Sequence, residues 1–231
     1  MGSDDLHHKR KARKGDALAR QKKERARSPR YLIVCEGSKT EPNYLRELVA
    51  DLKIRPQTVK IAPNDGTSPD RIVAHALALY EEEVASGDGF DNVFCVFDRD
   101  CHASFDSAVQ QIRDWQGSDT PKPFEAITSI PCFEYWLLLH FGLTEQPFHA
   151  AGKKSVCDSV ITVLRKKPDF KTYGKGQHGI YALLKGKTTT AIAAAKSIRK
   201  GAKVNGQKDS LTHVDELVEA LQALAKLQNG A

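Results

Sequence analysis

Several features that define common protein classes are missing from this sequence. None of its five cysteines forms a C-x-x-C pair, and Cys35 and Cys95 lie inside apolar runs, where cysteine usually acts as a small hydrophobic residue. This usage favours a reducing, intracellular compartment. No apolar stretch is as long as a transmembrane helix, and the N-terminal residues contain no apolar signal core. We therefore expect a cytoplasmic protein without a membrane partner.

A complete nucleotide-binding loop is also missing. GKTTT at 186–190 resembles the end of a P-loop, but that motif needs a glycine where Tyr181 stands and a strand before it. We therefore assign no ATP site to this chain. A zinc site built from Cys101, His102 and Cys132 would have no recognised ligand spacing.

Large apolar residues are nearly absent from the first thirty positions, which are dense in lysine and arginine. Such a segment cannot bury a core face, so we expect a basic, disordered arm over residues 1–29. The arm could bind nucleic-acid phosphates or act only as a solubilising tail, and its charge does not distinguish the two. Its candidate phosphate contacts are Arg10, Arg13, Lys22 and Lys23.

Beyond the arm, strand and helix patterns alternate along the chain. The predicted strands cover 31–36, 58–63, 92–98 and 124–130, and the predicted helices between and after them cover 41–53, 69–85, 104–115 and 132–141. This order predicts an α/β fold with an open, mainly parallel sheet and helices on both faces. Further helices are predicted over 153–167, 188–200 and 211–228. We thus divide the chain into a core over 30–142 and a mainly helical extension over 143–231.

Carboxylates stand at the ends of two of the predicted strands. Glu36 closes the first strand, Asp98 closes the third, and Asp100 lies two positions further on. The carboxyl ends of parallel strands meet at one edge of a sheet, so these acids should converge. Hard oxygen ligands suit Mg²⁺ or Mn²⁺, which can bind a phosphodiester. Gly37 would let a phosphate approach the turn, and Lys39 would face the same site.

A further acid and two histidines lie near the same edge. Glu134, expected in the first turn of the helix after Pro131, could be another metal ligand or could simply favour the helix N-terminus. We interpret His140 as a packing residue on a different helical face. We interpret His102 as a solvent-facing residue before a helix, although its position after Asp100 leaves a role near the metal open.

The loop at 171–178 is basic, glycine-rich and contains one aromatic residue, Tyr173. Loops of this type track phosphates and stack bases. Its candidate nucleic-acid contacts are Lys171, Lys175 and His178. A surface loop without a partner is the alternative.

These motifs resemble a known family. VCEG and FDRD, at the ends of the first and third strands, are similar to the metal-binding core of Toprim domains. Together with IVCEGSKTEPNYL, SIPCFEYWLLLHF and LTHVDELVEAL they resemble the RloB-like (AbiLii-type) family over residues 30 to 222. The resemblance implies a Toprim fold and a Mg²⁺-dependent nuclease. By position, Glu36 matches the acid/base glutamate, and Asp98 and Asp100 match the metal-binding aspartates.

The resemblance also implies a role in bacterial defence against phage, with an ABC-type or AAA-type ATPase encoded nearby. We therefore expect a metal-dependent nuclease acting on DNA or RNA, tRNA included, with Glu36, Asp98, Asp100 and Lys39 at its centre. The alternative is a non-catalytic nucleic-acid-binding or sensor subunit of an ATPase complex, and a nucleotidyl transferase is a third candidate. The substrate, the trigger and whether the protein is a homo-oligomer are left open.

Overall fold

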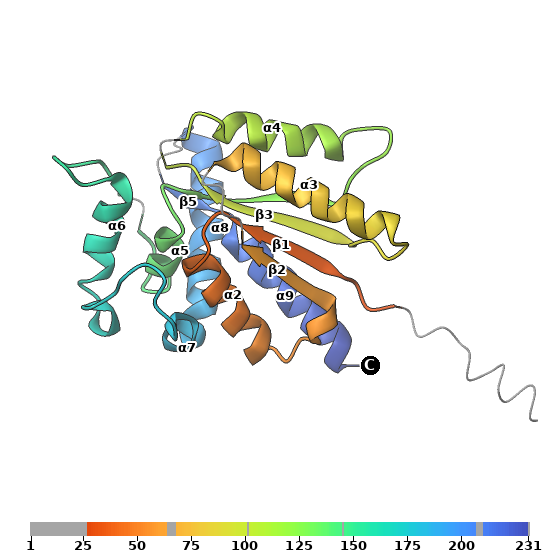
Figure 1. Ribbon diagram of the computed structural model, residues 1–231. Helices are drawn as coiled ribbons and strands as arrows, with labels where there is room; N and C mark the ends of the chain where they lie inside the picture. The colour runs from red at the N-terminus through yellow and green to blue at the C-terminus, as the bar shows by residue number, and fades with distance from the viewer. Residues whose placement is uncertain (1–26, 64–67, 101, 145, 207–209, 231) are drawn as a thin grey trace, which may run out of the picture.

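The predicted fold class is confirmed by a computed structural model, which describes residues 27–63, 68–100, 102–144, 146–206 and 210–230 (Figure 1). Five strands form one open sheet in the order β2-β1-β3-β4-β5. The first four are parallel, and the last pairs antiparallel with its neighbour. The strands are β1 (Tyr31–Cys35), β2 (Val59–Pro63), β3 (Asn92–Asp98), β4 (Phe124–Ile130) and β5 (Leu211–Thr212).

Helices cover both faces of the sheet (Figure 1). One face carries α3 (Pro69–Ala85) and α4 (Phe105–Gln116), and the other carries α2 (Thr40–Asp51), α5 (Glu134–Leu139), α8 (Thr188–Asn205) and α9 (Val214–Asn229). Alternate residues of β1 enter two different cores: Leu32 and Val34 pack with α3, whereas Ile33 and Cys35 pack with α2. A strand covered on both sides must be apolar at every position, which explains the continuous run YLIVC.

The remaining elements lie mostly beyond the carboxyl ends of the strands (Figure 1). They are α6 (Val156–Leu164), α7 (Ile180–Leu184) and the short 3-10 turns at Pro168–Phe170 and Lys185–Lys187, while a third such turn, Pro56–Thr58, precedes β2. The larger hydrophobic core contains residues from both sides of Gly142, among them Trp136 and Leu217. No helix of the described ranges is long and apolar enough to cross a membrane.

Local differences from the sequence-based expectation have local causes. The helix predicted over 211–228 begins at Val214, because Leu211 and Thr212 add a short strand to the free edge of β4. That strand exists only through its pairing partner, so no pattern within two residues could reveal it. The helix predicted over 41–53 begins at Thr40, whose hydroxyl accepts the Gly176 N–H at 2.9 Å.

Candidate functional site

Glu36 is held between two strands at the carboxyl edge of the sheet. Its own N–H continues the ladder of β1 by donating to the Val96 carbonyl at 2.9 Å. Its side chain reaches across to β3, where Oε2 accepts the Asp98 N–H at 2.8 Å. The strand register thus fixes where this carboxylate lies, as the sequence predicted.

Asp98 connects β3 to the next junction along the sheet. Its Oδ2 accepts the Phe133 N–H at 3.1 Å, just before α5 begins at Glu134. Asp100 lies two residues on, exposed, with φ at 32° and its N–H donated to the Pro131 carbonyl at 3.1 Å. Asp100 is close enough to raise the pKa of Glu36, although it is a minor cause.

Glu41, in the first turn of α2, is a member of the same cluster that sequence reasoning did not assign. Its side chain is buried, with 9% of its surface exposed. A Cβ added to Gly37 would lie 2.7 Å from Glu41 Oε2, closer than real Cβ contacts come. Glycine in the E-G turn therefore makes room for this carboxylate. The signal was present in the sequence, since Glu41 stands in the same SKTE segment.

Glu134 lies at the edge of the sheet, as predicted. It is the first residue of α5 and only 2% exposed. Its Oε1 accepts a hydrogen bond of 3.2 Å from the hydroxyl of Tyr173, which is also buried. The expectation that Tyr173 is available for base stacking is therefore wrong: its ring is in the core and its hydroxyl orients a carboxylate. Nothing in the local sequence around Tyr173 indicated this long-range contact.

Repulsion from neighbouring carboxylates adds to burial in raising the pKa of Asp98 and of Glu41. Burial is the largest cause for Asp98, whose pKa lies well above its usual range, and Glu41, Glu134 and Glu36 add to it. Burial followed by repulsion from Glu134 and Glu36 raises the pKa of Glu41 to about 7. Burial also raises the pKa of Glu36, against the opposing effects of the Asp98 N–H and His102. Such a cluster is fully charged at neutral pH only when a cation neutralises it.

The interpretation of His102 as a solvent-facing residue is wrong, because its side chain contacts Glu36. Its Nε2 lies 3.1 Å from Glu36 Oε1, and its side chain is 24% exposed. The histidine and the Asp98 N–H therefore hold the two oxygens of one carboxylate. The turn after β3 brings this residue back to the end of β1, which spacing along the chain could not predict.

The loop 171–178 is fastened to the start of α2. Asn43 Nδ2 donates to the Gly176 carbonyl at 3.1 Å, and a Cβ on Gly176 would meet the Lys39 side chain at 3.0 Å. The structure thus brings together Lys39 and the loop, two elements predicted separately as phosphate contacts. His178 Nε2 lies 3.5 Å from Asn43 Nδ2. Lys171 is exposed, and Arg10, Arg13, Lys22 and Lys23 lie outside the described residues.

Lys175 is the cation of this loop that interacts with the carboxylates. Burial lowers its pKa, but Glu134, two neighbouring thiols and Asp98 outweigh that effect, so the net shift is upward. An ammonium group in this position is charged at every physiological pH.

A second set of donor atoms adjoins the carboxylates. One atom each from Cys132, Glu134 and Cys157 lie within 4.8 Å of one another, and all three residues are buried. Thiol sulfurs suit soft cations such as Zn²⁺ rather than Mg²⁺. This set is not the zinc site of Cys101, His102 and Cys132 considered from the sequence. His102 contacts Glu36 instead, and Cys101 is outside the described residues.

His140 is the packing residue that the sequence predicted. It is 1% exposed, and its Nδ1 lies 3.0 Å from the Trp136 carbonyl, to which it must donate. Burial lowers the pKa of His140 to about 4, so the ring is neutral at pH 7.

Comparison with known proteins supports the resemblance to the RloB-like family. A family model described as RloB-like protein matches residues 31–221, which include every carboxylate of the cluster. No curated protein and no solved structure matches the chain.

Proposed function

Because the chain belongs to the RloB-like family, and because its strand ends gather carboxylates, we propose that it is a metal-dependent phosphodiesterase acting on nucleic acid. We assign it a Toprim-type centre that uses Mg²⁺ or Mn²⁺. One observation carries the proposal. Glu36, Glu41, Asp98 and Glu134 come from three separate strand-to-helix junctions, and Glu36 and Glu134 lie close enough to raise the pKa of both Glu41 and Asp98. Folding opposes such an arrangement unless a bound cation offsets the repulsion.

The donor set fits a hard divalent cation. Glu36, Asp98 and Glu41 supply carboxylate oxygens only, and Glu134 supplies another whose partner oxygen is held by Tyr173. Asp100 is exposed beside them and is assigned to the same centre from its position in the D-x-D motif. Bound Mg²⁺ would neutralise charge on a phosphodiester and make a coordinated water a better nucleophile.

The protein groups around the metal site have separate roles. Glu36 is the group best suited to move a proton, since its pKa is raised and His102 can share the proton through their 3.1 Å contact. Lys175 would offset phosphate charge from the side of the loop, and Lys39 from the start of α2. The backbone N–H groups of Asp98 and Phe133 orient the carboxylates before substrate arrives.

The test is cleavage of end-labelled RNA and DNA by the purified chain, with Mg²⁺, Mn²⁺ or EDTA. We expect Asp98→Asn to lower the rate at least a hundredfold, because it removes a metal-binding charge. Asp106→Asn is the matched control, since Asp106 is an exposed acid in the first turn of α4. New ends that appear without metal, or that persist in Asp98→Asn, would contradict the proposal.

The biological setting is proposed from the family alone. We propose a part in bacterial defence against phage, alongside an ABC-type or AAA-type ATPase. In the competing function, the chain is a nucleic-acid sensor whose carboxylates bind metal without turnover. Co-expression with the ATPase, followed by sequencing of the host nucleic-acid ends, separates the two, because new ends that vanish in Asp98→Asn form only if the chain hydrolyses nucleic acid.

A further inference from the structure

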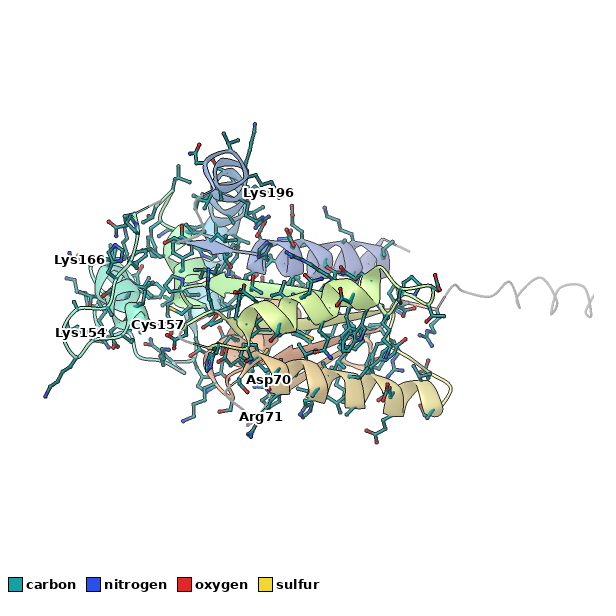
Figure 2. All side chains as sticks on the ribbon, turned by 90° about the horizontal axis from the view of Figure 1, so that it is seen from above. Asp70, Arg71, Lys154, Cys157, Lys166 and Lys196 are labelled. Carbon is teal, nitrogen blue, oxygen red and sulfur yellow. The ribbon has the colours of Figure 1, made fainter. Side chains whose placement is uncertain are left out.

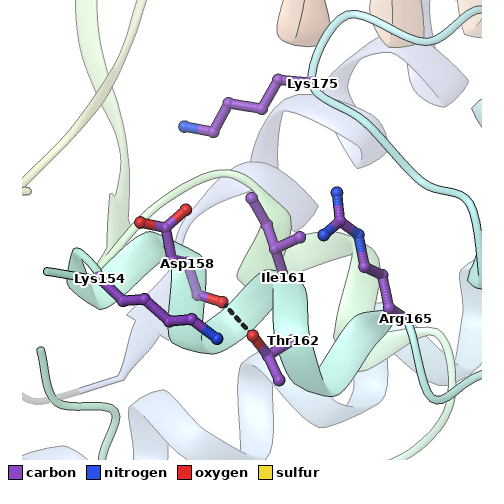
Figure 3. Close-up of a pocket in the computed structure, with 6 residues that line it drawn as sticks. All are labelled: Lys154, Asp158, Ile161, Thr162, Arg165 and Lys175. Carbon is purple, nitrogen blue, oxygen red and sulfur yellow. Dashed lines mark hydrogen bonds between the residues drawn. The ribbon is translucent and has the colours of Figure 1, made fainter. Parts of the chain in front are cut away.

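A pocket of about 370 Å³ opens on the surface of α6 (Figure 3). We name it the α6 pocket. Three of its six lining residues are cations and one is an acid, so its walls carry net positive charge. The lining residues are Lys154, Asp158, Ile161, Thr162, Arg165 and Lys175.

The acid in the α6 pocket already has a structural task. Asp158 Oδ2 accepts the N–H and the hydroxyl of Ser155, each at 2.9 Å, and closes the capping box of α6. Those hydrogen bonds lower the pKa of Asp158, with Lys175 and Lys154 adding to the effect. The carboxylate therefore stabilises the helix start, and two positive charges remain in excess.

The cations are held in place from different elements. Arg165 Nε donates to the Tyr173 carbonyl at 2.9 Å, which uses one of the five guanidinium N–H groups and leaves the others for a ligand. Lys175 extends over α6 from the 171–178 loop, and Ile161 lies on α6 between Asp158 and Arg165 (Figure 3). An anion in this pocket would meet cations from the 171–178 loop and from both ends of α6.

The surroundings of the pocket are basic as well. Residues 153–175 contain seven lysines and arginines and two aspartates. Lys154 and Lys166 lie at the α6 end of the molecule, away from Lys196 on α8 (Figure 2). Clustered exposed cations of this kind attract polyanions more strongly than single phosphates.

Lys175 connects this pocket to the carboxylates. The same side chain lines the pocket and interacts electrostatically with Glu134 and Asp98. We propose that the α6 pocket binds a backbone phosphate of a nucleic-acid strand, adjacent to the phosphate that enters the carboxylate site. Ile161 gives the pocket an apolar wall against which a sugar can pack. This inference rests on the proposed function for the identity of the anion.

The test measures binding without cleavage. Fluorescence anisotropy with labelled single-stranded RNA, and with DNA of the same sequence, is recorded in EDTA for the full chain carrying Glu36→Gln. We expect the double variant Lys154→Ala, Arg165→Ala to weaken binding about tenfold at low salt. The slope of log affinity against log salt should fall by about 0.7, since one phosphate contact on a single strand is lost. Lys196→Ala, Lys203→Ala is the charge-matched control on α8.

The outcomes separate this inference from the nuclease proposal. A loss of RNA or DNA affinity in the α6 double variant but not in the α8 control supports the phosphate subsite, and the stronger ligand names the substrate class. The phosphate subsite is overturned if the α6 double variant and the α8 control lose affinity equally, or if the starting protein does not bind RNA or DNA. Neither result depends on metal or turnover, so cleavage that vanishes in Asp98→Asn would leave the proposed function standing. Unchanged thermal unfolding confirms that the variants fold.

Discussion

Among single residues, Gly37 has a role that its neighbours explain. It comes directly after Glu36, and the space that a Cβ would occupy is taken by Glu41 Oε2 at 2.7 Å. Any side chain there would displace one of the clustered carboxylates without entering the hydrophobic core. The glycine after Glu36 thus allows Glu36 and Glu41, from adjacent elements, to lie beside each other.

We expect Gly37→Ala to weaken Mn²⁺ binding about tenfold while lowering the free energy of unfolding by only about 1 kcal/mol, because a flexible carboxylate can move aside. Calorimetric titration with Mn²⁺ and urea unfolding measure the two effects. Gly186→Ala is the control, since nothing lies within 4 Å of the added Cβ and its φ is not in the left-handed region. A large stability loss with unchanged metal affinity would show that Gly37 serves the fold instead.

Among the structural elements, the 171–178 loop and the start of α2 act as one unit. Gly176 lies at the centre of this unit, with φ at 81°. Its N–H donates to the Thr40 hydroxyl, and its carbonyl accepts the Asn43 side-chain amide. Further along, Glu47 accepts the N–H groups of Gly179 at 2.6 Å and Tyr181 at 3.1 Å. These contacts fix the backbone from which Lys175 projects.

Gly176→Ala should cost about 1–2 kcal/mol of stability through its positive φ and, in addition, push against Lys39. Gly206→Ala at the end of α8 is the control, because it reproduces the strain of a positive φ without a steric contact: φ is 68° there and the space around the residue is open. We expect both variants to unfold at similar denaturant concentrations but only Gly176→Ala to lose nucleic-acid affinity. If their affinities are equal, the loop does not position Lys175 for binding.

For the molecule as a whole, the raised pKa values of the buried carboxylates make stability depend on pH. The pKa of Glu41 rises from 4.5 to about 7 on folding, so the folded protein binds its proton more tightly. That stabilising effect is complete below pH 4.5 and is lost as pH rises to 7. It amounts to about 3 kcal/mol. His140, with its pKa lowered to about 4, makes stability rise with pH instead. The effect of Glu41 is therefore measured as the difference in stability between the original chain and a Glu41 variant.

The metal-free Glu41→Gln variant should therefore gain stability relative to the original chain as pH rises from 4.5 to 7, since the amide never has to lose a proton. Urea unfolding in EDTA across that range measures it. Added Mg²⁺ should stabilise the original chain most at the upper end of the range, where the carboxylates are free of protons. A constant difference between the two proteins across this range would mean that Glu41 titrates normally.

Much of the fold can be predicted from local pattern. Strands buried on both faces are continuous apolar runs, and β1 and β3 lie where those runs do. Because parallel strands share a carboxyl edge, the meeting of Glu36 with Asp98 and the placement of Glu134 were predictable from order alone. The strand β5 was not predictable, because its two residues form a strand only by pairing with the edge of β4.

The order of residues encodes the layers of the fold, the parallel arrangement of the strands and the sheet edge at which the acids gather. All three features depend on the period of the hydrophobic residues and on chain direction. Which side chains complete the site depends on tertiary packing. Glu41 turns inward because Gly37 leaves room, His102 returns to Glu36, and Tyr173 reaches Glu134 across a separation of 39 positions. Such contacts join elements that are distant along the chain, and no local pattern encodes them.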